Sequence, residues 1–145
     1  ISPAMGAETI DPKKLAELDQ VVRALHPDLV ASFYCVGGFT QRAVNEYAIA
    51  ARPGNDTKTG SYFVYTRDGR LTKLSNFSGG MDMQCLTNEE AQELNPIIQQ
   101  SGMHGRIPDS HPFDTVCGFV DATTAVCWGY DEKERVFIAL GGWIT

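Results

Sequence analysis

The sequence predicts an α+β fold: a single antiparallel sheet of about five to six strands with two main helices packed against it. Three observations predict this class. An apolar stripe of helical period opens the chain, a helix-capping motif stands at residues 87–90, and the other apolar segments alternate as strands do. A hairpin at residues 61–74 and a three-stranded meander at residues 115–143 supply most of the sheet.

The chain has the length and composition of one globular domain. It has 145 residues, of which 43% are hydrophobic and 21% charged, so residues 7–145 are expected to form a single domain. Residues 1–6 are predicted to be a cloning remnant. No apolar run approaches the roughly 20 residues of a membrane helix, so no membrane span is expected. The net charge of −6 argues against nucleic-acid binding.

The first helix is predicted to begin at Asp11, whose side chain caps free backbone amides, and at Pro12, which fits a first helical position. It is expected to end at His26, because the residue before Pro27 avoids helical geometry. The apolar stripe between these points recurs every three or four residues and comprises Leu15, Leu18, Val22 and Leu25.

The second helix is predicted from a capping box, in which Thr87 and Glu90 bond each other's backbone amides and Leu86 packs against the following turn. Pro96 removes one backbone donor, so the helix should kink or stop there. Gly102 ends the segment.

The strand predictions rest on alternation and turn residues. Residues 29–36 fit either a short helix or a buried strand, whereas residues 43–51 indicate a strand. Asp68-Gly69 is a favoured hairpin turn. Residues 77–85 are expected to be an irregular loop. The closing strands are predicted at residues 115–120, 124–130 and 136–143.

Four cysteines predict two disulfide bonds. A hairpin turn centred on Ala122 places Cys117 directly opposite Cys127, close enough for a bridge, and leaves Cys35 to pair with Cys85. The alternative is four reduced cysteines in a cytosolic protein. Zinc is not expected, because no two cysteines are spaced C-x-x-C. Paired cysteines predict a secreted or periplasmic protein.

The best catalytic candidate is the polar loop at residues 102–114, which holds two of the three histidines. His104, Asp109 and His111 could hold a metal, or a histidine oriented by Asp109 could activate Ser110 as a nucleophile. Their spacing matches no established motif, so no catalytic residue, metal or cofactor is favoured. A polar surface loop is the preferred interpretation.

Two features indicate binding. The loops at residues 76–84 and 102–114 are rich in Gly, Met and Pro and could enter a partner's cleft. Trp128 and Tyr130 share one strand face, opposite Cys127, and form either core or an exposed aromatic patch. The candidate binding residues are Met81, Asp82, Met83, Met103, His104, Arg106, Trp128 and Tyr130.

The sequence therefore predicts an exported, disulfide-stabilised, non-catalytic binding protein, of the inhibitor or immunity type, that occludes another exported protein. Residues 81–145 hold three basic and ten acidic residues, so a cationic partner would be attracted to this half. Two alternatives stay open. One is a small hydrolase or metal-dependent enzyme that uses the His104–His111 loop, and the other is a surface or filament subunit without its N-terminal anchor.

Overall fold

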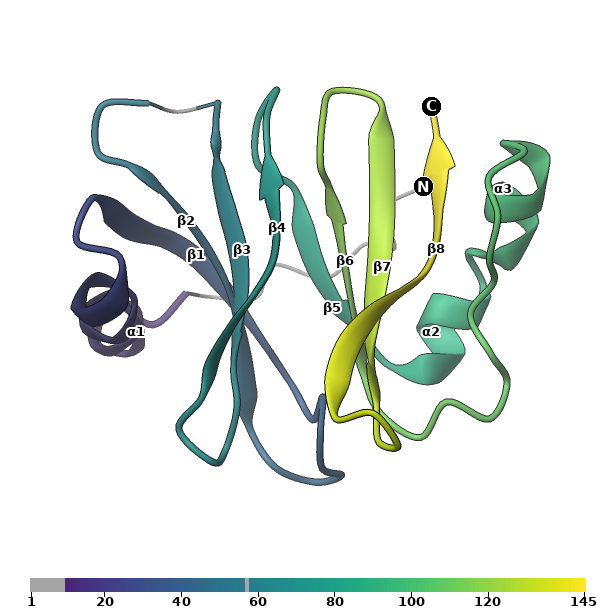
Figure 1. Cartoon of the computed structure of the whole chain (residues 1–145), viewed down its shortest axis with the longest axis horizontal. Helices are drawn as coiled ribbons and strands as arrows, with labels where there is room; N and C mark the ends of the chain where they lie inside the picture. The colour runs from purple at the N-terminus through teal and green to yellow at the C-terminus, as the bar shows by residue number, and fades with distance from the viewer. Residues whose placement is uncertain (1–9, 57) are drawn as a thin grey trace.

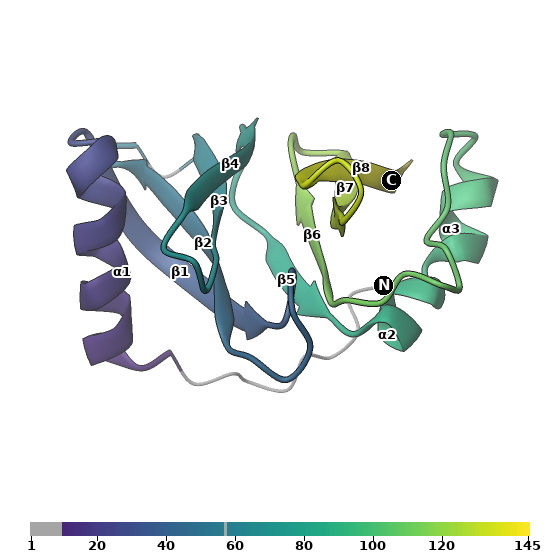
Figure 2. The same cartoon turned by 60° about the horizontal axis from the view of Figure 1, so that its bottom comes forward.

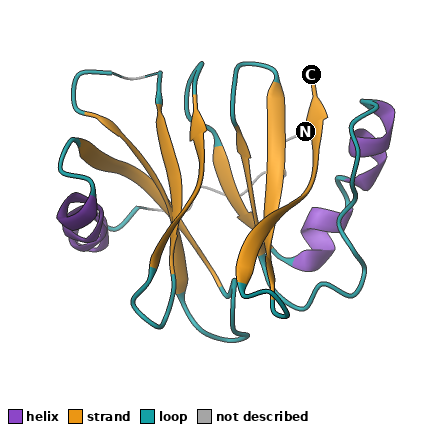
Figure 3. Ribbon diagram, viewed as in Figure 1, coloured by secondary structure: helices purple, strands orange, loops and turns teal. Residues whose placement is uncertain are grey.

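The structure, a computed structural model, describes residues 10–56 and 58–145, so the predicted cloning remnant lies outside the described residues. It has two four-stranded antiparallel sheets (Figures 1 and 3). The first sheet comprises β1 (Leu29–Gly37), β2 (Glu46–Pro53), β3 (Gly60–Tyr65) and β4 (Leu71–Phe77). The second sheet comprises β5 (Met83–Leu86), β6 (Thr115–Phe119), β7 (Thr124–Asp131) and β8 (Val136–Ile144). The helices are α1 (Pro12–Leu25), α2 (Asn88–Gln92) and α3 (Asn95–Gln100).

The elements form four layers, with α1 outside the first sheet and the short helices α2 and α3 outside the second (Figure 1). Each interface is filled by its own apolar cluster. The cluster under α1 includes Leu18, Val22, Ile49 and Phe63. The cluster between the sheets includes Ala48, Ala50, Tyr62, Val64, Val116 and Trp128. The cluster under α2 and α3 includes Leu86, Ala91, Leu94, Ile98, Cys127 and Trp143.

The prediction of a single sheet is wrong. After β4 the chain crosses to the second sheet, where β5 pairs with β6 and not with β4. Two packed sheets remove more apolar surface from water, because the inner face of each sheet is buried against the other and the outer face is buried against a helix. Residues 29–36, which fitted helix or strand, form β1.

The two sheets are fastened to each other at β1 and β5. Cys35 and Cys85 form a disulfide there, with their Cα atoms 5.7 Å apart, and Figure 2 shows the two strands meeting. The buried Tyr62 hydroxyl adds a second link, because it donates to the carbonyl oxygen of Phe119 at 2.7 Å and accepts from the Asp82 amide at 3.3 Å. Burial raises the pKa of Tyr62 to about 12, so this phenol stays a hydrogen-bond donor at neutral pH.

The predicted helix signals are confirmed. The Lys13 amide donates to the Asp11 side chain at 3.0 Å, and both bonds of the capping box between Thr87 and Glu90 are present. The second helical segment is interrupted after Gln92 and resumes at Asn95, which places Pro96 in the first turn of α3. Proline is tolerated there because its missing amide hydrogen has no partner to lose.

The structure contains both predicted disulfide bonds. Cys117 and Cys127 are directly paired across β6 and β7 and belong to the cluster beneath α2 and α3. Disulfides persist in oxidising compartments, so the two bonds are those of an exported protein. Within residues 10–56 and 58–145, no helix combines the length and the apolar character that crossing a membrane would require.

Candidate functional site

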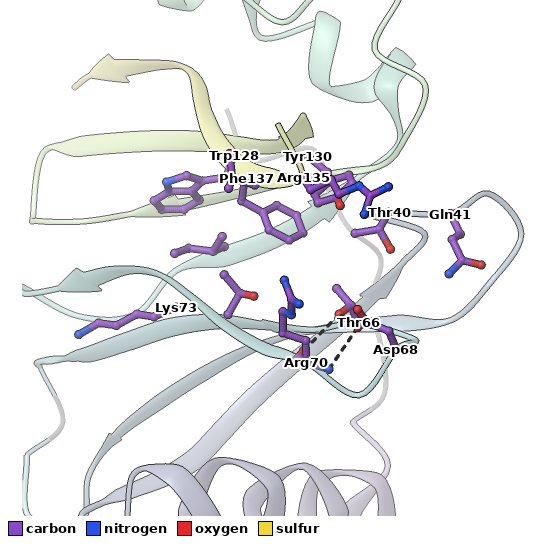
Figure 4. A pocket seen from close by; sticks show the side chains of 13 residues that line it. Thr40, Gln41, Thr66, Asp68, Arg70, Lys73, Trp128, Tyr130, Arg135 and Phe137 are labelled. Atoms are coloured by element: carbon purple, nitrogen blue, oxygen red, sulfur yellow. Dashed lines mark hydrogen bonds between the residues drawn. The ribbon is translucent and has the colours of Figure 1, made fainter. Parts of the chain in front are cut away.

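A cleft of about 360 Å³ opens between the two sheets, on the side where β4 faces β7 and β8 (Figure 4). Its size falls in the range of small-ligand pockets, which are roughly 300–1,000 Å³. One wall comes from the first sheet, through β4, the β3–β4 turn and the β1–β2 connection. The other wall comes from β7, β8 and the turn between them.

Aromatic side chains form the wall that belongs to the second sheet. Trp128 and Tyr130 lie on the inner face of β7, opposite Cys127, as alternation predicted. Phe137 is the cross-strand partner of Tyr130, with the two ring centroids 5.2 Å apart. Trp128 is only 6% exposed and belongs to the core between the sheets, whereas Tyr130 and Phe137 are half-buried. The aromatic patch is therefore part core and part cleft wall.

Three cations line the same cleft. Arg70 and Lys73 come from the first sheet, Arg135 comes from the β7–β8 turn, and all three are exposed. Figure 4 shows Arg70 pointing into the cleft, while Arg135 lies on the opposite wall. Among the residues that the structure describes, none of the three forms an ion pair. A chain of net charge −6 thus concentrates positive charge beside aromatic rings.

Asp68 is the one acidic residue in the cleft lining, and its carboxylate is hydrogen-bonded within the β3–β4 turn. Its carboxylate accepts hydrogen bonds from the Thr66 hydroxyl and from the Arg70 amide. These bonds, that of Thr66 foremost, lower the pKa of Asp68. The carboxylate stays ionised at neutral pH and shapes the β3–β4 turn from which Arg70 projects.

A buried carboxylate positions the loops at one end of the cleft. Glu46, at the start of β2, is fully buried. It accepts hydrogen bonds from the amides of Phe39 and Thr40 at 2.8 Å, from the Thr40 hydroxyl at 2.6 Å and from the Arg67 amide at 2.9 Å. These bonds tie the β1–β2 connection to the β3–β4 turn, and both segments contribute to the cleft.

The structure brings the residues of the predicted catalytic loop together only in part, because Ser110 and His111 line one surface hollow whereas His104 lines a different one. His104 is exposed, and the Asp109 carboxylate pairs with Arg106 at 3.2 Å. His111 is half-buried, and Ser110 is exposed. In the described part of the chain, no group of three His, Cys, Asp or Glu side chains is arranged to hold a metal ion.

The predicted binding residues are scattered over the molecule, and only Trp128 and Tyr130 line the cleft. Met83 is 4% exposed and belongs to the core between the sheets. The remaining predicted binding residues lie elsewhere on the surface. Met81 and Asp82 line one hollow, Met103 and His104 line a second, and Arg106 forms the ion pair with Asp109. Sequence reasoning missed the cleft residues Arg70, Lys73, Arg135 and Phe137. The excess of basic over acidic residues in the segment 37–80 was the available signal for Arg70 and Lys73 only.

The imidazole of His111 is packed into the protein beside this loop. Its ring lies against Gly129 and edge-on to Phe113, 6.1 Å between ring centroids. Nε2 is buried and has no hydrogen-bond partner among the described residues. Burial lowers the pKa of His111 below its ordinary value of 6.5, and the charge of Glu132 opposes this only partly.

The free energy of unfolding is expected to decrease as the pH falls below about 6.5, the ordinary pKa of histidine. Below this pH the unfolded chain binds a proton at His111 more readily than the folded protein does. The free energy of unfolding therefore has its full value above this pH and decreases below it. His111→Gln should flatten this dependence in denaturant titrations between about pH 5 and pH 7. Equal slopes in the wild type and the His111→Gln variant would contradict the assignment.

The cleft combines guanidinium groups with aromatic rings. Guanidinium groups bind carboxylates and phosphates, and aromatic rings pack against apolar groups or stack on planar ones. No protein-family model, curated protein or solved structure matches the chain.

Proposed function

We propose that this chain is a secreted or periplasmic, non-catalytic binding protein that captures a protruding segment of another exported protein and so occludes it. The observation that carries the proposal is the cleft, which joins an aromatic wall to cations that form no ion pair within the described residues. Aromatic residues and arginine are the side chains that dominate binding energy at protein interfaces.

The scaffold supports this function, because it holds the two walls of the cleft in place before a partner arrives. The Cys35–Cys85 bridge and the Tyr62 hydroxyl fasten one sheet to the other. The Glu46 carboxylate fixes two loops at one end of the cleft. A site that is ordered beforehand loses less entropy on binding, which favours tight capture by a small protein.

The partner's charge follows from the position of the cations. The acidic C-terminal half suggested a cationic partner, and it can still speed the approach of one. The cleft itself carries Arg70, Lys73 and Arg135 against the single acidic residue Asp68. A partner can therefore be cationic as a whole, while the segment that it inserts into the cleft does not have to be basic.

The test is capture of the partner from the exported fraction of the source cells, with the oxidised protein immobilised as bait. Arg70→Glu combined with Arg135→Glu reverses two charges of the cleft. The matched control, Lys13→Glu with Lys58→Glu, makes the same charge change at exposed positions outside the cleft. We expect the same protein to be retained by the wild type and the control, and at least about tenfold less of it by the cleft variant.

Retention of that protein by the cleft variant at the wild-type level would contradict the proposal. So would the absence of any specifically retained protein with the wild type. Circular dichroism of the three proteins establishes that each bait is folded.

A further inference from the structure

Arg135 has a backbone conformation that glycine or asparagine usually adopts. Its φ is 56°, in the left-handed region, and it closes the β7–β8 turn by donating its amide to the carbonyl oxygen of Asp131 at 2.7 Å. In this region a side chain crowds its own backbone, whereas glycine does not. Among the described residues, the only other one of this kind apart from the glycines is Ala43, with φ 60°.

Backbone strain of this kind is enriched at binding and catalytic sites, so a strained residue whose side chain also lines a cleft is a candidate for binding. Arg135 lines the cleft, on the wall opposite Arg70 (Figure 4). Neither guanidinium group forms an ion pair with a carboxylate of the described residues, although the charge of Arg70 contributes to lowering the pKa of Asp68. Asp131 accepts from the amides of Lys133 and Glu134, and Asp68 accepts from its own turn.

The rings beside Arg135 define the rest of the ligand. Phe137 is two residues further along β8, and its ring packs against Tyr130 at the same wall. A group bound by the two arginines therefore lies next to a half-buried apolar surface. An acidic side chain with an apolar neighbour in sequence satisfies both parts of the site, since a guanidinium binds a carboxylate through two parallel hydrogen bonds.

We propose that Arg70 and Arg135 together bind the carboxylate of an Asp or Glu in the captured segment, with the adjacent apolar residue on the Tyr130–Phe137 wall. The inference rests on the proposed function and names the chemistry of the partner. Glycine at this position would relax the turn but would remove the carboxylate contact.

The test uses two short probes, the capped tripeptides acetyl-Leu-Glu-Leu-amide and acetyl-Leu-Gln-Leu-amide, titrated into the isotope-labelled full chain. Amide signals of the β3–β4 turn and of Arg135–Phe137 should shift with the Glu peptide, and the Gln peptide should bind at least about tenfold more weakly. Raising the salt concentration should weaken the Glu peptide selectively, because the contact between exposed charges is screened.

Arg135→Gly separates binding from strain. This variant should bind the Glu peptide no better than the Gln peptide, yet its denaturation midpoint should rise because the turn relaxes. Ala43→Gly is the matched control: it relieves the same backbone conformation outside the cleft lining, and should raise the midpoint without changing peptide affinity. Arg135→Gln, which keeps a side chain, should lose the Glu preference as well.

Equal affinity for the two peptides, unchanged discrimination in Arg135→Gly and Arg135→Gln, or no binding at millimolar peptide would each overturn the carboxylate site. The proposed function would survive such a result if Arg70→Glu with Arg135→Glu still abolished partner capture. Discrimination between the peptides without any captured protein would leave the carboxylate site standing and remove the proposed function.

Discussion

Replacing Cys35 and Cys85 together by alanine is expected to lower the free energy of unfolding by about 4 kcal/mol, because the bridge closes a loop with a sequence separation of 50 residues. Without the bridge, the unfolded chain gains the freedom that the link removes. The folded protein also loses the fastening between β1 and β5, so affinity for the partner should decrease with stability. Denaturant unfolding of the oxidised wild type and the variant measures the effect.

The second disulfide provides the matched comparison. Cys117 and Cys127 are separated by only 10 residues, so their joint replacement by alanine should cost less, about 3 kcal/mol. It also lies beneath α2 and α3, away from the interface between the sheets. A smaller loss for the Cys35–Cys85 variant than for this one would contradict the role assigned to the long bridge.

Replacing Glu46 by glutamine is expected to lower the free energy of unfolding by about 3 kcal/mol, because an NH₂ group then faces backbone donors inside the protein. Both carboxylate oxygens of Glu46 accept hydrogen bonds, from Phe39, Thr40 and Arg67. The side-chain amide of glutamine has a single oxygen, so it can replace only one of the two carboxylate oxygens. The three amides should exchange hydrogen faster in the variant, which separates loosening of these loops from a general loss of stability.

Glu93→Gln serves as the control for Glu46→Gln, because Glu93 is exposed at the end of α2. Its unfolding free energy should stay within about 0.5 kcal/mol of the wild type. A Glu46→Gln variant as stable as this control would show that the buried carboxylate does not hold the loops.

Local signals in the sequence predicted local structure well. The caps at Asp11 and Thr87, the Asp68-Gly69 turn and the pairing of Cys117 with Cys127 all depend on residues close together in the chain. Each is decided by backbone geometry over a few residues, which a short stretch of sequence specifies.

The arrangement of the strands into sheets could not be predicted in the same way. Alternation identifies a strand but not its neighbour, so a hairpin and a meander were assigned to one sheet. β5 is only four residues long, too short to show alternation, and it lies in a segment expected to be a loop. β1 is apolar on both faces because it contacts two clusters, which removed the alternation that distinguishes strand from helix.

The candidate site was predicted in part. Alternation placed Trp128 and Tyr130 on one face, and the structure puts both on the cleft wall. Arg70 and Arg135 lie in different hairpins, so only the packing of one sheet on the other brings them to the same cleft. Glu46 resembles any surface glutamate in the sequence, since its burial depends on amides from two separate loops.

The long bridge has a consequence for survival among extracellular proteases. The turn at Arg67–Arg70 is exposed and lies between the two linked cysteines, Cys35 and Cys85. A cut in this turn would yield two polypeptides still joined through sulfur, with the buried clusters continuing to hold their layers together. In denaturing gel electrophoresis the cleaved molecule would migrate as one species without reductant and as two species with it. Cleavage would therefore not by itself release either fragment.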